Sequence, residues 1–441
     1  MKKAWTRRRF LVAAAGAGVG TRLLAGGARA DKPAILGGTP VRKEPFPTWP
    51  VTGETDERAL LDVLRSGRWF RGDGKVVDRF EEAYAKLTGA AHCIATANGT
   101  SSLITALHAA GVEAGDEVVL PPYTFIACPN AVLALNALPV FADTDPETFQ
   151  IDPARIEAAI TEHTRAIMPV HLGGSAADLD AILAIARKHR VAVIEDACQP
   201  HLGEWRGRKV GTHGDAGCFS FQASKNLNSG EGGAVLTGNR DLAERCFAFH
   251  NNSFGRPPAA PSRTARGVNV RMTEFQAALL LSQMARLEEQ AARRDENGRY
   301  LTSLLKEIPG IHPARMYEGC TRNAYHLYLF RYDKERFAGL SRASFLRSLG
   351  AEGIGASSGY SPLNKEPFLE ATLGSRGFRA IYSPERIARW KERNHCPRND
   401  RLCEEGVWLY QSVLLAGRND MEGIAEAIRK IQAHAGELAR A

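Results

Sequence analysis

Short apolar runs alternate with stretches of helical periodicity between residues 92 and 238. Each run is bounded by turn-forming residues, which is typical of strands buried on both faces of a sheet. The runs are His92–Ala95, Glu117–Leu120, Leu138–Ala142, Ala166–His171, Val191–Glu195, Cys218–Phe221 and Ala234–Thr237. The helical stretches between them are Ser101–Ala110, Ile126–Leu135, Asp152–Thr161 and Ala177–His189. This alternation predicts an α/β fold in which helices cover a mainly parallel, seven-stranded sheet.

The segments that flank this alternation predict an arm and a second domain. Asp31–Pro50 is rich in glycine and proline and indicates an extended arm. Glu274–Leu305 is a long amphipathic stretch that we expect to bridge two domains. Residues 310–441 mix strands and helices, as in a smaller α+β domain. The predicted division is an N-terminal segment 1–30, a large domain with its arm 31–285 and a small C-terminal domain 286–441.

The basic charge of the chain is concentrated at its N-terminus. Of the 441 residues, 57 are Lys or Arg and 49 are Asp or Glu, so the formal net charge is +8. Residues 1–30 contain seven basic residues and no acidic one, which leaves 8 − 7 = +1 for the remainder. The main body is therefore nearly neutral, and its charge predicts no nucleic-acid partner.

The same thirty residues resemble a twin-arginine export signal. Thr6-Arg7-Arg8-Arg9-Phe10-Leu11 precedes an uncharged run that ends at Gly20, and Ala28-Arg29-Ala30 has the form of a signal-peptidase site. The uncharged run is shorter than the roughly 20 residues that span a bilayer. We expect export to the periplasm or another extracytoplasmic compartment, with no membrane association after signal cleavage. A chance basic N-terminus is the alternative interpretation.

The spacing of the eight cysteines does not match that of a metal site. None is spaced as Cys-x-x-Cys and no histidine cluster accompanies them, so we expect no metal. Four of them lie in apolar contexts that favour buried free thiols: Cys93, Cys128, Cys198 and Cys218. Three others lie in sequence typical of loops, where an exported protein could form a disulfide: Cys320, Cys396 and Cys403.

Two segments that follow predicted strands suggest a site for a phosphorylated ring compound. Asn98-Gly99-Thr100-Ser101 opens a helix, and the N–H groups and dipole of a helix N-terminus attract phosphate. An ordinary helix cap is the alternative interpretation. Phe125 follows the strand Glu117–Leu120, where an aromatic side chain can lie flat on a ring-shaped cofactor. Phe125 could instead belong to the core.

Two further segments carry an acid and a lysine. Asp196 ends the apolar strand Val191–Glu195, and a carboxylate there can pair with a pyridinium nitrogen. A helix cap or a metal ligand is the alternative role. Lys225 comes just after the buried strand Cys218–Phe221, where desolvation lowers the pKa of an amine and favours Schiff-base formation. The alternative is a surface lysine.

Together these segments resemble the DegT/DnrJ/EryC1/StrS family of sugar aminotransferases, which are fold-type I enzymes that use pyridoxal 5'-phosphate (PLP). The similarity extends from Gly37 to about Ile431, and it is strongest from Glu195-Asp196 through Lys225-Asn226 to Gly230-Glu231-Gly232-Gly233. The arm residues Phe46-Pro47-Thr48-Trp49-Pro50 resemble most the branch that contains glutamine:scyllo-inosose aminotransferase and 3-amino-5-hydroxybenzoate synthase.

The resemblance implies a role for each matching residue. Lys225 matches the lysine that binds the cofactor covalently and moves the proton, and Asp196 matches the acid on the pyridinium nitrogen. Gln199 matches the residue beside the cofactor's phenolic oxygen, and Phe125 the aromatic side chain on the ring. The matches to the phosphate site are Gly99, Thr100, Ser220 and Asn269. In the family the last of these reaches over from the partner subunit, which implies a homodimer with shared active sites.

The family also implies the reaction. We expect a PLP-dependent aminotransferase of amino-sugar biosynthesis that moves an amino group from glutamate or glutamine to a keto-sugar or keto-cyclitol. Gly359 and Val270 depart from the family's pattern, so the acceptor stays open. One alternative is a PLP-dependent sugar dehydratase or lyase, although Lys225 argues against the dehydratases, which have histidine there. The other is an exported, non-catalytic sugar-binding protein on the same fold.

Overall fold

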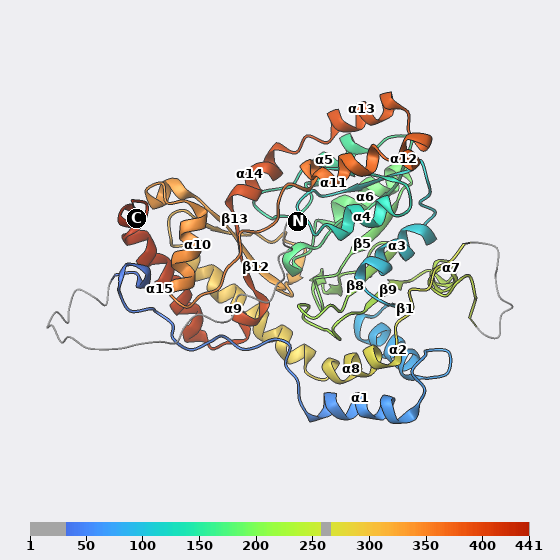
Figure 1. Ribbon diagram of the computed structural model, residues 1–441, viewed down its shortest axis with the longest axis horizontal. Helices are drawn as coiled ribbons and strands as arrows, with labels where there is room; N and C mark the ends of the chain where they lie inside the picture. Colours follow the sequence, from blue (N-terminus) through green and yellow to red (C-terminus); the bar gives the residue numbers. More distant parts are fainter. Residues whose placement is uncertain (1–31, 257–265, 441) are drawn as a thin grey trace, which may run out of the picture.

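The computed structural model describes residues 32–256 and 266–440, and a seven-stranded sheet lies at its centre (Figure 1). The residues predicted to form an export signal and its cleavage site lie outside this range. The strand order across the sheet is β1-β9-β8-β5-β4-β2-β3. The strands are β1 (His92–Thr96), β2 (Glu117–Leu120), β3 (Leu138–Phe141), β4 (Thr164–Ile167), β5 (Ala192–Asp196), β8 (Ala216–Ser220) and β9 (Gly233–Thr237). All seven predicted strands are therefore present, and the α/β fold class is confirmed.

One strand runs against the others. β9 is antiparallel to both of its neighbours, β1 and β8, whereas β2, β3, β4, β5 and β8 pair in parallel. The carboxyl ends of the parallel strands consequently meet at one edge of the sheet, which is where ligands of open α/β sheets bind. β5 and β8 are neighbours at that edge, and Asp196 is in register with Cys218.

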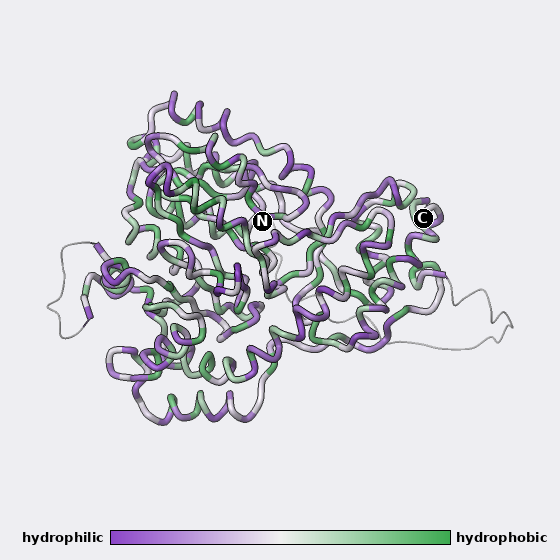
Figure 2. Tube along the Cα trace, turned by 180° about the vertical axis from the view of Figure 1, so that it is seen from behind, coloured by the Kyte–Doolittle hydropathy of each residue, from purple (hydrophilic) through white to green (hydrophobic). Residues whose placement is uncertain are grey.

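Alternate residues of β1, β8 and β9 enter two separate cores on the two faces of the sheet. Ile94 of β1 packs in the core that includes α3 (Gly99–Ala109) and α4 (Ala127–Leu133). Its neighbour Ala95 packs in the other core, with α2 (Val76–Thr88) and α8 (Glu274–Met284). Figure 2 shows apolar stretches concentrated inside the molecule and more polar stretches along its outer rim. Burial on both faces is the reason why the strands read as continuous apolar runs.

The long amphipathic stretch divides into two helices. α8 ends at Met284, and α9 (Leu287–Leu305) begins three residues later. The side chain of Arg286 between them donates hydrogen bonds to Val51 O at 2.8 Å and to Asp56 Oδ2 at 2.6 Å. The arm and α1 (Glu54–Ser66) are thereby tied to the junction between the helices.

The C-terminal part contains a second sheet and its own core. The sheet consists of β10 (Ile311–Pro313), β12 (Leu327–Tyr332) and β13 (Gly406–Tyr410), all antiparallel. α9, α10 (Arg342–Ala351) and α15 (Arg418–Ala433) pack against it and share this core.

A segment of the C-terminal part packs on the large sheet instead. It comprises α11 (Pro367–Leu373), α12 (Arg376–Ile381), α13 (Pro384–Arg393) and α14 (Pro397–Glu405), which lie beside α5 (Pro153–Ala159) and α6 (Leu179–His189) in Figure 1. Trp390 Nε1 donates to Pro139 O at 2.6 Å, and Asn394 Oδ1 accepts from Phe141 N at 2.7 Å. The sequence analysis did not find these helices, and the division at residues 285 and 286 stays a prediction.

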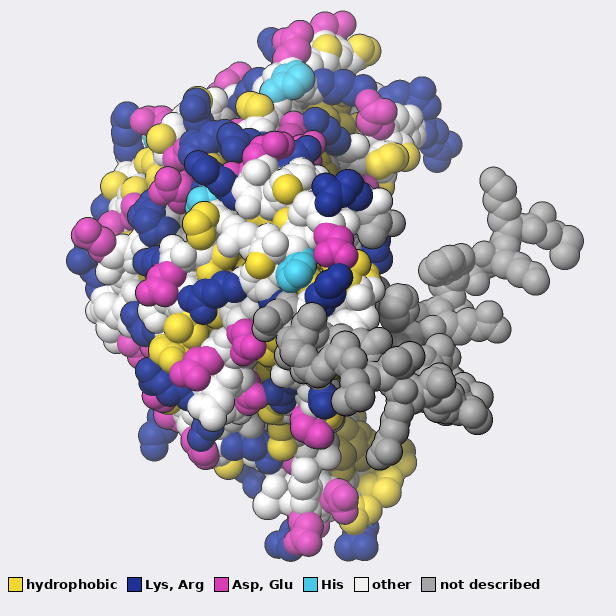
Figure 3. Space-filling view, turned by 90° about the vertical axis from the view of Figure 1, so that its left-hand side faces the viewer, with side chains coloured by type: hydrophobic (Ala, Val, Ile, Leu, Met, Phe, Trp, Pro, Cys, Tyr) yellow, Lys and Arg dark blue, Asp and Glu magenta, His cyan; other side chains and the backbone are white. Residues whose placement is uncertain are grey.

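The charges on the surface agree with the nearly neutral composition of the main body, and the cysteines form no disulfide in the described residues. Lys or Arg and Asp or Glu side chains are interspersed on the face seen in Figure 3, as expected for a nearly neutral body. All eight cysteines are free thiols, including Cys320, Cys396 and Cys403, which are buried. No helix in the described part of the chain is long and apolar enough to cross a membrane.

Candidate active site

The predicted site residues gather where β5 and β8 end. Asp196 is the last residue of β5, Ser220 is the last residue of β8, and Gly99 is the first residue of α3. Lys225 lies in the turn that follows β8, with its backbone N–H bonded to Gln222 O at 2.8 Å. Segments up to 126 residues apart in sequence (99 to 225) therefore meet at one edge of the sheet.

A glycine at position 99 lets the N-terminus of α3 approach β8 closely. A Cβ atom on Gly99 would lie 2.6 Å from Ser220 Cβ and 3.0 Å from Cys198 Sγ, so a larger residue would displace the helix. Asn98 Oδ1 caps the helix by accepting from Ser101 N at 2.8 Å. Gly99, half-buried Thr100 and the Ser220 hydroxyl are thus brought together beside a helix N-terminus, an arrangement that fits a phosphate group.

Asp196 is buried and held by donors on both oxygens. Its Oδ1 accepts from Cys198 N at 3.0 Å, and its Oδ2 accepts from the Cys128 thiol at 2.9 Å. Burial raises the pKa of Cys128 well above the usual thiol value, so the sulfur stays protonated and remains a donor. Thr124 Oγ1 lies 3.1 Å from the same sulfur. These contacts fix the orientation of the carboxylate without neutralising its charge.

The adjacent acid, Glu195, has a structural role. It points to the opposite face and accepts from Gly211 N and Gly214 N, while His171 Nε2 lies 3.0 Å from its carboxylate. Burial alone would raise the pKa of Glu195, but the hydrogen bonds outweigh it and hold the pKa below its usual value. Of the two acids that end the apolar run, only Asp196 therefore faces the site.

The amine of Lys225 is electrostatically coupled to the groups around Asp196. The positive charge of Lys225 lowers the pKa values of the Cys128 and Cys198 thiols. Burial raises both pKa values by more than this, so they are well above the usual thiol value. Burial is the main reason why the pKa of His201 is lowered to about 3, and the charge of Lys225 contributes to this shift. Lys225 and Asp196 both act on the buried thiols Cys128 and Cys198, and their assignment to one cofactor site stays a prediction.

Two predicted residues have different surroundings from the rest. Phe125 follows β2 and is 57% exposed, so its ring is available to a ligand rather than packed in the core. Asn269 is exposed and forms an isolated bridge with Asn251. Within the described residues, no hydrogen bond joins Asn269 to the phosphate cradle of its own chain.

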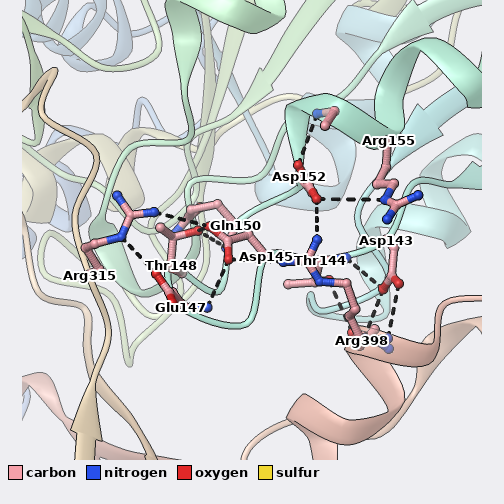
Figure 4. A network of polar contacts seen from close by, with 12 residues as sticks. Asp143, Thr144, Asp145, Glu147, Thr148, Gln150, Asp152, Arg155, Arg315 and Arg398 are labelled. Atoms are coloured by element: carbon pink, nitrogen blue, oxygen red, sulfur yellow. Dashed lines mark hydrogen bonds and ion pairs between the residues drawn. The ribbon is translucent and has the colours of Figure 1, made fainter.

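Gln199 is positioned by a network that the sequence analysis missed. It is buried, and its Oε1 accepts from Gly173 N at 2.6 Å. The preceding residue Leu172 is clamped by Gln150, which donates to its carbonyl and accepts from its N–H. Figure 4 shows how the loop that carries Gln150 is tied to Arg315 and Arg398 from the C-terminal part.

Three further residues at the site were given no role in the sequence analysis: Asn226, His326 and Tyr360. Asn226 Nδ2 donates to Ala324 O at 2.8 Å, and His326 Nδ1 lies 3.4 Å from Asn226 Oδ1. Burial raises the pKa of Tyr360, and contact with Gln199 opposes that shift. The signal available in the sequence was weak, because a buried histidine or tyrosine is usually a core residue.

The residues present fit PLP. A phosphate fits the cradle of Gly99, Thr100 and Ser220, a pyridinium nitrogen suits the fixed carboxylate of Asp196, and Lys225 supplies an amine for the aldehyde. The described residues contain no group of three or more acids, cysteines and histidines that could hold a metal ion.

Comparison with known proteins gives matches along nearly the whole chain. A profile described as the DegT/DnrJ/EryC1/StrS aminotransferase family matches residues 50–381. L-glutamine:2-deoxy-scyllo-inosose aminotransferase of Streptoalloteichus tenebrarius is 39% identical, with 92% of this chain and 98% of the relative covered. L-glutamine:scyllo-inosose aminotransferase of Streptomyces griseus is also 39% identical, with 92% and 99% covered.

A solved structure gives the same result for the fold. The crystal structure of 3-amino-5-hydroxybenzoic acid synthase is 34% identical, has a TM-score of 0.79, and covers 90% of this chain and 100% of its own. A Bacillus subtilis structure with bound PMP is 27% identical, with a TM-score of 0.73 and coverage of 88% and 86%.

The roles of Lys225 and Asp196 are separable by substitution. Lys225→Ala should abolish both turnover and the visible absorbance of lysine-bound PLP, because no amine remains to hold the aldehyde. Asp196→Ala should retain most of the cofactor but lower activity by at least about 10²-fold, because the ring nitrogen loses its carboxylate. Absorbance spectra and kcat of the purified variants test this. Full transamination by the Lys225→Ala variant would refute the assignment.

Proposed function

Because this chain belongs to the DegT/DnrJ/EryC1/StrS aminotransferase family and is a PLP-dependent enzyme, we propose that it transfers an amino group from L-glutamine to a keto-cyclitol. Within the same reaction, L-glutamate is the alternative amino donor and a keto-sugar is the alternative acceptor. The observation that carries the proposal is the meeting of the Gly99–Ser220 cradle, the fixed carboxylate of Asp196 and Lys225 at one edge of the sheet. The two relatives at 39% identity are both named as acting on L-glutamine and an inosose.

Each residue of the site has a defined task in this reaction. PLP, when bound, supplies a ring that withdraws electrons from the substrate carbon. Asp196 keeps the ring nitrogen protonated through a charge-assisted hydrogen bond. Lys225 holds the cofactor until the donor amine replaces it, and then takes the proton from the donor Cα. Cys128 and Cys198 hold Asp196 in place during these steps.

The substrates can be tested one half-reaction at a time. L-glutamine should convert the visible absorbance of the purified, PLP-loaded protein to the absorbance of the amine form. Scyllo-inosose or its 2-deoxy form should then restore the visible band and yield an aminocyclitol, identified by mass spectrometry. A dehydrated product would instead favour a dehydratase or lyase. Failure of every donor to change the spectrum would favour a non-catalytic sugar-binding protein.

We also propose that the enzyme is a homodimer whose subunits share their active sites. Asn269 lies on a surface with several exposed apolar side chains, among them Trp69, Phe70 and Val268, which are 51%, 48% and 40% exposed. Arg271 lies over the ring of Phe70, and Trp69 O accepts from Glu274 N, so Trp69 and Phe70 lie beside this segment. Such a patch is typical of a surface that a second copy covers.

Mixed dimers test the sharing. Lys225→Ala and Asn269→Ala should each be inactive or severely impaired alone. In a mixed dimer, one site would combine Lys225 of one subunit with Asn269 of the other and be intact. Random mixing should therefore restore about a quarter of the wild-type activity. No recovery after mixing, with dimers present by light scattering, would place Asn269 in its own subunit's site or in neither.

The N-terminal segment supports a further proposal, that the enzyme is exported through the twin-arginine route to a periplasmic or other extracytoplasmic compartment. The Thr6-Arg7-Arg8-Arg9-Phe10-Leu11 motif carries it. Replacing Arg7 and Arg8 together by lysine should retain the protein in the cytoplasm, as cell fractionation would show. Equal distribution of the wild type and this variant would contradict the proposal.

A further inference from the structure

A buried arginine beside the site lacks a counter-ion. Arg294 on α9 has 0% of its surface exposed, and its Nε donates to Gln411 Oε1 at 2.8 Å. Its two terminal nitrogens, Nη1 and Nη2, have no hydrogen-bond partner among the described residues. Burial lowers the pKa of Arg294 to about 9, with no acidic side chain to oppose the shift. Burying a cation without a counter-ion costs free energy, so an unpaired buried arginine indicates a site for an anion.

A second unpaired donor lies next to it. The ring of Trp49, in the N-terminal arm, has its centroid 5.0 Å from Arg294 Cζ. Its Nε1 is also buried and has no hydrogen-bond partner in the described part of the chain. Three buried nitrogens that can only donate therefore lie together without an acceptor. A carboxylate accepts through both oxygens and pairs with guanidinium in a fixed geometry, so it fits this set of donors.

Arg294 lies on the helix that packs against the loop 323–326, and this loop contacts the residue after Lys225. One turn after Arg294 on the same helix, a Cβ on Gly298 would lie 2.6 Å from the ring of Tyr325, so this face of α9 packs on that loop. The neighbouring residues Ala324 and His326 hold Asn226, which follows Lys225. Burial lowers the pKa of His326, and Lys225 and Arg294 both lower it further. Both cations therefore act on one small region.

We propose that Arg294 and Trp49 form the site that binds the carboxylate of the amino donor. The inference rests on the proposed function, in which L-glutamine carries a carboxylate and the keto-cyclitol carries no charge. Of the two substrates, only the donor can therefore supply an anion to a buried cation. Trp49 belongs to an arm whose neighbouring residues Thr48 and Pro50 are exposed, so the ring that covers the guanidinium lies in a surface segment.

A pair of unreactive analogues tests the site by binding. Glutaramate has the carbon chain, amide and carboxylate of L-glutamine but no amine, and pentanediamide replaces the carboxylate by a second amide. Calorimetric titration of the PLP-loaded wild type should show glutaramate binding at least about tenfold more tightly than pentanediamide. Arg294→Met should weaken glutaramate about 10- to 100-fold and leave pentanediamide unchanged.

Two controls separate recognition from folding. Since Arg294 has no anion in the chain and only the hydrogen bond to Gln411 is lost, methionine should lower the thermal midpoint by no more than a few degrees. If Arg294→Met does not fold, Trp49→Phe keeps the ring, removes one donor and should weaken glutaramate up to about tenfold. Arg294→Lys keeps the charge without the planar fork and should bind glutaramate with intermediate affinity.

Several outcomes would overturn the inference. It fails if wild-type protein does not distinguish the two analogues, or if Arg294→Met weakens both equally or neither. It also fails if Trp49→Phe binds both analogues as the wild type does. Failure of the proposed function is read separately, because it would leave the wild-type spectrum unchanged by L-glutamine whatever the analogues do.

Discussion

The candidate site depends on the close approach of a helix N-terminus to the end of a buried strand. The approach is possible because residue 99 has no Cβ, which would otherwise lie 2.6 Å from Ser220 Cβ. The N-terminal end of the α3 dipole is directed at the sheet edge, where it favours an anion. The turn after β8 that carries Lys225 is also brought beside Asp196, because β5 and β8 are neighbours.

The two acids at the end of β5 show how one strand can supply both structure and chemistry. Successive side chains of a strand point to opposite faces. Glu195 is surrounded by backbone N–H groups and His171, which hold its charge inside the protein. Asp196 has only the Cys198 N–H and the Cys128 thiol as donors, and a thiol is a weak one. Its carboxylate therefore retains capacity for a stronger partner such as a pyridinium nitrogen.

The C-terminal part contributes to the site from several directions. Arg315 and Arg398 secure the loop whose Gln150 places the segment next to Gln199. Ala324 and His326 hold Asn226 beside the lysine. α9 and the arm enclose Arg294. The site is thus assembled between elements distant in sequence, and changes in the position of the C-terminal part would be transmitted to it through these contacts.

The sequence by itself determined the seven strands, their alternation with helices, and the family that places Lys225, Asp196 and the phosphate residues in one site. These features depend on local periodicity and short motifs, which can be recognised directly in the sequence. Only the tertiary structure decided which of the two acids faces the site, that helices α11–α14 pack on the large sheet, and that Cys320, Cys396 and Cys403 are buried thiols. It also decided that Arg294 is enclosed without an anion. Burial and the choice of partners are set by residues far along the chain, so no local pattern reveals them.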